Sequence, residues 1–155
     1  MDEALVSRWN ARVAPDDEVW HLGDFAYRLG AERSGALLGR LAGRKHLLLG
    51  NNDGEATAAL PGWASVGHYA EFELGGVRLV LCHYAFRTWN GMYKGGYNLH
   101  GHSHGALAPL RRQVDVGVDV WDYRPVTLDE IRAKPRRKIA RPRAASALAA
   151  ERKAR

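Results

Sequence analysis

The chain has 155 residues, of which 46% are hydrophobic and 26% are charged, and its formal net charge is +6. This length is enough for one domain with its own hydrophobic core. The single cysteine, Cys82, excludes an intrachain disulfide, and the apolar runs are far shorter than the roughly 20 residues that span a bilayer. We therefore expect a cytoplasmic protein with no membrane segment.

The positive charge is concentrated at the C-terminal end. Residues 132–155 contain ten lysines and arginines and one acidic residue, whereas the rest of the chain has 13 basic and 16 acidic residues. This asymmetry is more typical of an enzyme with an appendage than of a domain with a basic binding face. We expect a folded domain over residues 1–134 and a basic, disordered tail over residues 135–155.

The first half of the chain predicts alternating helices and strands. Leu5, Trp9 and Val13 recur at helical spacing, which indicates an amphipathic helix over residues 2–13. A short strand over residues 18–22 follows, and leucines at helical spacing then indicate a second helix. The predicted order is a helix at 2–13, a strand at 18–22, a helix at 31–41 and a strand at 45–49.

The middle of the chain changes pattern. Residues 68–74 alternate in polarity, Gly75-Gly76 can form a two-residue turn, and residues 77–82 are apolar. These features predict a β-hairpin. The glycine-rich segment 87–96 has no clear period, so we expect a surface loop of the kind that often borders a site.

The last part of the domain predicts one strand and one helix. Four valines alternate with aspartate and glycine over residues 114–120, which favours a strand with one buried face. Thr127 followed by Glu130 forms a capping-box pattern, so a final helix should begin at Thr127.

Polar side chains follow four of the apolar runs, at the point where each run ends at or near a glycine. The four segments are Gly23-Asp24, Gly50-Asn51-Asn52-Asp53, Cys82-His83 and His100-Gly101-His102-Ser103-His104. Strand ends are where α/β sheets bind ligands. Carboxylate, amide and imidazole ligands together favour Mn, Fe, Zn or Co over Ca. His102 and His104 are about 6.6 Å apart if extended, so each can reach a different ion of a pair.

These motifs resemble those of the calcineurin-like metallophosphoesterases, in particular small bacterial and phage members. The matching segments are residues 21–25, 49–53, 83–84, 99–105 and 115–123. The resemblance implies an α/β fold with a calcineurin-like double β-sheet sandwich flanked by helices, here lacking the first strand.

The resemblance also implies a centre of two divalent transition-metal ions, with Mn favoured. By motif position, one ion would take Asp24, Asn51, His83 and His102, and the other, more weakly held or absent, would take Asp24 and His104. Tyr84 and Arg87 would contribute to substrate binding. The remaining histidines are assigned to structural roles: His21, His46, His68 and His100.

Two departures from the family pattern are evident. No Asp-x-His motif precedes Asp24, so we expect the natural chain to start upstream of Met1. Asn52 stands where the family has a histidine, and its amide can donate a hydrogen bond but cannot act as an acid at neutral pH. This favours phosphodiesters over alkyl monoesters, with Asn52 contacting a phosphoryl oxygen.

The sequence therefore predicts hydrolysis of phosphate esters by a metal-bound hydroxide at a dinuclear centre. Two alternatives stay open. The chain can be a catalytically silent relative that serves as a binding or scaffold protein, or a nucleic-acid-associated protein that acts through its basic tail. The oligomeric state and the identity of the phosphate-ester substrate are left open.

Overall fold

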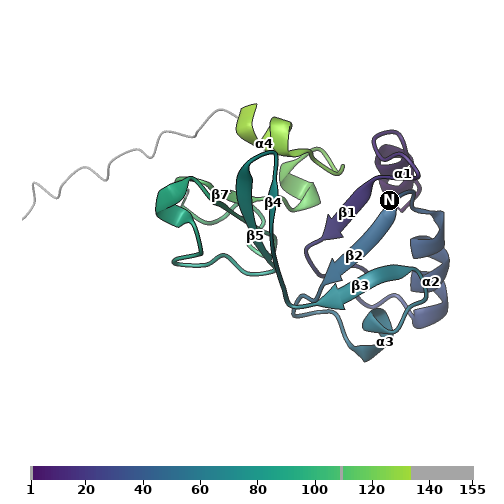
Figure 1. Ribbon diagram of the computed structural model, residues 1–155. Helices are drawn as coiled ribbons and strands as arrows, with labels where there is room; N and C mark the ends of the chain where they lie inside the picture. The colour runs from purple at the N-terminus through teal and green to yellow at the C-terminus, as the bar shows by residue number, and fades with distance from the viewer. Residues whose placement is uncertain (1, 109, 134–155) are drawn as a thin grey trace, which may run out of the picture.

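The computed structural model describes residues 2–108 and 110–133, which form two β-sheets and a few short helices (Figure 1). The first sheet contains β1 (Glu18–His21), β2 (Arg44–Leu48) and β3 (Trp63–Gly67), in that order. All three strands are parallel, and β1 pairs with β2 in register from Glu18 and Arg44 onward.

The second sheet is mixed and has four strands. Its order is β4 (Tyr69–Leu74), β5 (Val77–Cys82), β6 (Tyr97–His100) and β7 (Gln113–Asp115). The β4 and β5 strands form an antiparallel hairpin, and β5, β6 and β7 then run parallel to one another. Loops rather than α-helices join these parallel strands, which gives this part of the chain a solenoid-like path.

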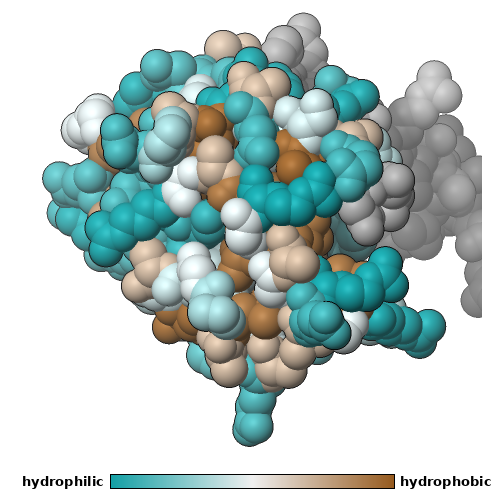
Figure 2. All heavy atoms as spheres, turned by 90° about the vertical axis from the view of Figure 1, so that its right-hand side faces the viewer, coloured by the Kyte–Doolittle hydropathy of each residue, from teal (hydrophilic) through white to brown (hydrophobic). Residues whose placement is uncertain are grey.

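The helices are few and short. They are α1 (Asp2–Asn10), α2 (Ala31–Arg40), α3 (Glu55–Ala58) and α4 (Leu128–Ala133), with 3-10 turns η1 (Met92–Lys94) and η2 (Val118–Val120). Both longer helices, α1 and α2, lie on the same side of the first sheet (Figure 1). Figure 2 views that side and shows mainly hydrophilic residues with apolar patches between them. Within the described ranges, no helix is long and apolar enough to cross a bilayer.

Two hydrophobic clusters hold the elements together. The larger joins Leu22 and Leu48, at the ends of β1 and β2, to Leu81 and Leu99 of the second sheet. The smaller one lies under α1 and includes Val6 and Trp9, whose indole nitrogen donates to the Ala42 carbonyl at 2.9 Å. Apolar contact between the sheets therefore brings the carboxyl ends of β1, β2, β5 and β6 toward each other.

The predicted calcineurin-like double β-sheet sandwich flanked by helices is wrong. The strands form a three-stranded parallel sheet and a separate four-stranded mixed sheet, and both long helices belong to the first sheet (Figure 1). The physical reason lies in the connections of the second sheet. The segments between β5 and β6 and between β6 and β7 are rich in glycine, which disfavours helix formation, so no α-helix joins these parallel strands.

Several predicted elements are confirmed. The predicted helices at 2–13 and 31–41 correspond to α1 and α2, and the predicted hairpin corresponds to β4 and β5 with positive φ at Gly75 and Gly76. The capping box is formed: Glu130 accepts from the Thr127 amide at 3.0 Å, and the Thr127 hydroxyl accepts from the Glu130 amide at 3.3 Å. The predicted tail, residues 135–155, lies outside the described residues.

The predicted strand at 114–120 is only partly correct. The strand β7 ends at Asp115, and a 3-10 turn, η2, takes the place of its second half. The Asp115 carboxylate accepts a hydrogen bond from the Gly117 amide at 2.9 Å, which turns the backbone out of the extended conformation. The strand β3 was not predicted, because residues 63–67 carry no clear alternation.

Candidate metal centre

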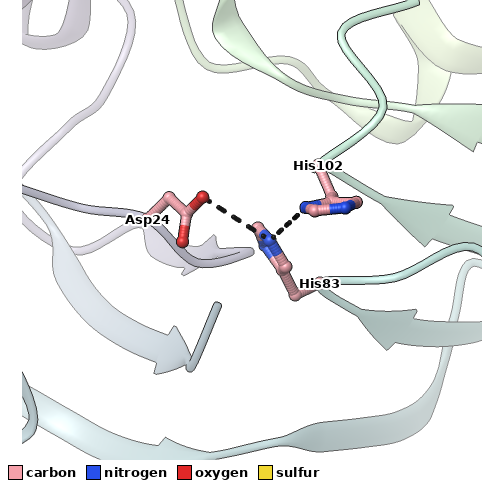
Figure 3. Close-up of side chains that lie close together, drawn as sticks. All are labelled: Asp24, His83 and His102. Carbon is pink, nitrogen blue, oxygen red and sulfur yellow. Dashed lines mark hydrogen bonds and ion pairs between the residues drawn. The ribbon is translucent and has the colours of Figure 1, made fainter. Parts of the chain in front are cut away.

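Four predicted ligands converge where strands of both sheets end. Asp24 follows β1, Asn51 follows β2, His83 follows β5 and His102 follows β6. In the close-up of Figure 3, Asp24, His83 and His102 point toward one another from three separate segments. One ligand atom from each of these three residues lies within 4.8 Å of the other two.

His83 is at the centre of this cluster and is buried, with 2% of its surface exposed. Its Nε2 atom lies 3.0 Å from Asn51 Oδ1, 3.2 Å from His102 Nδ1 and 3.6 Å from Asp24 Oδ2. These four side chains therefore present four potential ligand atoms to one small volume.

The tautomer of His83 follows from its other nitrogen. Nδ1 lies 2.7 Å from the Leu22 carbonyl, which can only accept, so Nδ1 carries the hydrogen and a neutral ring leaves the Nε2 lone pair facing the cluster. In the neutral ring, that lone pair faces the oxygens of Asn51 and Asp24 with no hydrogen between them. A divalent cation would satisfy all of these acceptors at once, and an imidazole that donates its second N–H to a carbonyl is the usual form of a metal ligand.

Two glycines allow the ligand loops to approach so closely. A Cβ atom at Gly23 would lie 2.5 Å from His83 Nδ1, and one at Gly50 would lie 2.3 Å from Asp24 Oδ1. Gly23 also has φ of +95°, a conformation that other residues avoid. The site therefore requires glycine before Asp24 and before Asn51.

Hydrogen bonds to the Asp53 carboxylate fix the first two loops to each other. Its carboxylate accepts from the backbone amides of Asp24 at 2.6 Å, Phe25 at 3.0 Å and Gly50 at 2.9 Å. Asn52 adds two more bonds, because its backbone amide and its side-chain amide donate to the two Asp24 oxygens, each at 2.8 Å. The predicted substrate-contacting residue is thus adjacent to the cluster.

Three of the predicted ligands have left-handed backbone conformations. The φ angles are +58° at Asp24, +61° at His102 and +47° at His104. Non-glycine residues in this region are uncommon and concentrate at functional sites, where the surrounding structure holds them in place.

His104 is not part of the cluster of Asp24, His83 and His102. Its Nδ1 contacts the Asp119 carboxylate at 2.7 Å, and most of its side chain, 77%, is exposed. The hydrogen bond that His104 donates to Asp119 and the charge of that carboxylate raise the pKa of His104. Asp119 was not predicted as a site residue, because its alternation with valines indicated the solvent face of a strand.

The two predicted substrate-binding residues after His83 differ in position. The Tyr84 ring packs edge-on against the rings of His83 and His102, with centroid distances of 4.9 and 4.8 Å, and the residue is exposed. Arg87 is exposed on the loop after β5, and no ion pair or hydrogen bond links it to the cluster within the described residues. Only Tyr84 therefore borders the cluster directly.

His21, assigned to a structural role, lies just before the first ligand loop. Burial lowers the pKa of its imidazole to about 4, and the nearby carboxylates of Asp53 and Asp24 oppose this effect. Its ring packs edge-on against Phe25 at 5.3 Å. His21 therefore remains neutral near pH 7 and supports the aromatic packing behind the loop.

Comparison with protein-family models finds no match. The chain is 28% identical over 170 residues to the Gene 66 protein of Mycobacterium phage L5, covering 84% of this chain and 78% of that protein. It is also 28% identical over 141 residues to the uncharacterized protein MJ1445 of Methanocaldococcus jannaschii, covering 84% and 73%. The crystal structure of AQ665 from Aquifex aeolicus, a protein of unknown function, matches with a TM-score of 0.67 and 21% identity over 85% of this chain and 83% of that chain. The structural match shows that AQ665 has a similar fold. None of the three matches assigns an activity.

Proposed function

We propose that this protein hydrolyses phosphate esters, preferentially phosphodiesters, with a divalent metal ion bound by Asp24, Asn51, His83 and His102. The observation that carries the proposal is that Asn51 Oδ1 and Asp24 Oδ2 lie 3.0 and 3.6 Å from His83 Nε2, the nitrogen that bears a lone pair in the neutral ring. The mixture of one carboxylate, one amide oxygen and two imidazoles favours Mn, Fe, Zn or Co. The sequence resemblance to metallophosphoesterases supports the same activity.

A divalent ion bound there would polarise a phosphoryl oxygen and lower the pKa of a bound water molecule toward neutrality. The residues of the chain would supply position and polarity. Hydrogen bonds to the Leu22 carbonyl and to the Asp53 carboxylate keep the His83 ring and the loops that carry Asp24 and Asn51 in one arrangement before substrate binds. We assign a second, weaker ion to Asp24 and His104, where Asp119 offers a further carboxylate.

Asn52 determines the preferred leaving group in this proposal. Its side-chain amide, which donates to Asp24 Oδ2 at 2.8 Å, can turn to donate to a phosphoryl oxygen instead. An amide cannot protonate a departing alkoxide at neutral pH. The enzyme should therefore cleave esters whose leaving group is stable as an anion or receives its proton from solvent.

The direct test compares two chromogenic substrates in the presence of Mn. Bis(4-nitrophenyl) phosphate should be hydrolysed faster than 4-nitrophenyl phosphate at equal concentrations. His83→Ala should lower the diester rate by about 100-fold or more, since loss of even an outer partner of a metal ligand costs roughly 10- to 100-fold. His68→Ala is the matched control, because His68 is exposed on the chain between β3 and β4 and should leave the rate unchanged.

Two results would decide against parts of the proposal. Faster cleavage of the monoester would contradict the proposed preference for phosphodiesters. Tight Mn binding without turnover of either substrate would favour a silent binding protein, the alternative function that the same cluster allows.

A further inference from the structure

A row of hydrogen-bonded polar side chains crosses the three strands of the first sheet. His46 in β2 lies directly opposite Trp20 in β1 and Ser65 in β3. Glu18 is two residues before Trp20, so its side chain projects from the same face of the sheet. This row of Glu18, His46 and Ser65 is separate from the candidate metal ligands, which follow the strand ends.

His46 is the middle member of the row and contacts both of the others. Its Nε2 atom contacts the Glu18 carboxylate, and its Nδ1 atom lies 2.6 Å from Ser65 Oγ. The residue is buried, and its ring stacks on Trp20 with 4.4 Å between the centroids and 13° between the planes. Burial and stacking therefore fix the orientation of the imidazole between its two partners.

The contact with Glu18 determines the tautomer of His46. The hydrogen bond from His46 lowers the pKa of Glu18, so this carboxylate is ionised near pH 7 and can only accept. In the neutral imidazole, Nε2 then carries the hydrogen, and Nδ1 accepts from the Ser65 hydroxyl. A hydroxyl, an imidazole and a carboxylate joined in this order are the groups of a serine nucleophile with its base.

Ser65 is accessible, because it is exposed and lies on an edge strand. In the part of the chain that the structure describes, β3 pairs with β2 alone. The Gly67 carbonyl accepts from the Leu49 amide at 2.7 Å on the β2 side, so the N–H of the preceding residue, Val66, points to the open side. The N–H of the residue after a serine nucleophile is a usual donor to the developing oxyanion.

We infer that Ser65 is a nucleophile that takes an acyl group from carboxylic esters, with His46 as its base. Ser65 Oγ bonds to the carbonyl carbon, and the hydroxyl proton passes to His46 Nδ1. The ester C–O bond then breaks, and the departing alkoxide takes that proton. Water attacks the acyl group on Ser65 by the same route, which releases the acid and restores the hydroxyl.

The surroundings of His46 indicate the class of ester. Trp20, Phe72 and Leu74 line, together with His46, a cavity of about 880 Å³ between the sheets. The alcohol that leaves beside His46 is therefore apolar. This inference does not depend on phosphoesterase activity, because no step of it uses a metal ion.

The experiment treats the full chain with a fluorophosphonate, which transfers its phosphonyl group to a nucleophilic serine as fluoride leaves. EDTA is present throughout, so the candidate metal centre does not contribute. Mass spectrometry of the digested protein should show Ser65 labelled about 100-fold faster or more than Ser7, an exposed serine in α1. Under the same conditions, hydrolysis of 4-nitrophenyl butyrate should fall about tenfold or more in Ser65→Ala.

Two variants test the base. His46→Gln keeps a polar side chain that cannot take up a proton, so it should slow labelling of Ser65 about 100-fold or more. His68→Gln, the same change at an exposed position between β3 and β4, is the matched control and should be labelled as fast as the wild type. Thermal unfolding identifies a variant that fails to fold, and the comparison of Ser65 with Ser7 in the wild type needs no variant.

Nitrogen NMR of the His46 ring tests the positioning role of Glu18. The wild type should show the tautomer with hydrogen on Nε2. Glu18→Ala removes the acceptor, so both tautomers should be populated and labelling of Ser65 should slow about tenfold or more. An unchanged tautomer and labelling rate would contradict this role.

Three outcomes would overturn the inference. Equal labelling of Ser65 and Ser7 would mean that His46 does not activate the hydroxyl and that their hydrogen bond only joins two strands. Wild-type labelling in a folded His46→Gln variant would mean that the imidazole is not the base. Undiminished hydrolysis of the butyrate ester by Ser65→Ala would mean that this serine takes no acyl group.

Discussion

At the scale of single residues, His83 and Asp53 perform complementary tasks. Hydrogen bonding to the Leu22 carbonyl selects the tautomer of His83 that leaves Nε2 free to bind a cation. Asp53 accepts three backbone N–H groups from the two loops that carry Asp24 and Asn51. His83 presents a ligand atom, and Asp53 holds the loops of Asp24 and Asn51 close to each other.

Replacement of Asp53 by asparagine should weaken metal binding. An asparagine has one oxygen in place of two, so at least one backbone N–H loses its acceptor, at a cost of about 1–3 kcal/mol in the free energy of unfolding. We expect Asp53→Asn to lower Mn affinity about 10- to 100-fold in a calorimetric titration. Asp16→Asn, the same change at an exposed position, is the control. Unchanged Mn affinity in Asp53→Asn would contradict the positioning role.

Replacement of Asn52 by histidine should change substrate preference. An imidazole can protonate a departing oxygen near neutral pH, which an amide cannot do. Asn52→His is therefore expected to raise hydrolysis of phenyl phosphate relative to bis(4-nitrophenyl) phosphate by about tenfold or more, within the range of general acid catalysis. A ratio that stays at the wild-type value would show that position 52 does not act on the leaving group.

At the scale of elements, the site depends on how strands end. Four strands end in turns at the same place, and glycine lets the turns after β1 and β2 approach within contact distance. The site therefore depends on these two glycines as well as on the ligand side chains.

Two alanine substitutions in one loop separate this effect from general loss of stability. A Cβ at Gly50 would lie 2.3 Å from Asp24 Oδ1, whereas no atom lies within 4 Å of a Cβ at Gly54, where φ is −99°. Gly50→Ala should reduce Mn affinity about tenfold or more, because it displaces a ligand. Gly54→Ala should leave affinity unchanged and maintain or slightly raise the melting temperature. Equal Mn affinities in the two variants would contradict the close approach.

At the scale of the whole molecule, ion pairs join the first helix to the last segment. Arg8 contacts Asp122 at 2.8 Å, and Arg12 contacts Glu130, which also receives Arg124 at 3.0 Å. The hydrogen bond from the backbone amide of Thr127 lowers the pKa of Glu130, and so do Arg12 and Arg124. These contacts connect α1 and the turn after it, which pack on the first sheet, to residues 122–130, which include the start of α4.

The lowered pKa of Glu130 predicts a pH dependence of stability. Its contribution is fully present above pH 4.5, the ordinary value, and is lost as the pH falls through the lowered folded-state pKa. Glu130→Gln should reduce the free energy of unfolding at pH 7 by about 0.2–1 kcal/mol per exposed pair. Urea denaturation at pH 7 and pH 3 measures the difference, which should shrink at the lower pH. An equal difference at both pH values would contradict the role of the charge.

The sequence correctly predicted the features that depend on residues close to one another in the chain. The capping box at Thr127 and Glu130 and the turn at Gly75-Gly76 were correct because the residues that form them are adjacent in the chain. The convergence of Asp24, His83 and His102 also followed from strand ends.

The errors concern features that depend on distant partners. The predicted sandwich failed because the pairing of strands depends on long-range packing. The predicted strand at 114–120 stops early because the Asp115 carboxylate accepts a hydrogen bond from the Gly117 amide. No local pattern in the sequence indicates which strands pair or which side chains form these hydrogen bonds.

The central claim is that Asp24, Asn51, His83 and His102 bind one divalent ion. The most direct measurement is anomalous diffraction from crystals soaked in millimolar MnCl₂. We predict a peak roughly 2.0–2.3 Å from ligand atoms of these four residues, at distances usual for first-row metals. A strong peak elsewhere on the protein, or no peak at the cluster while the crystals diffract well, would contradict the account.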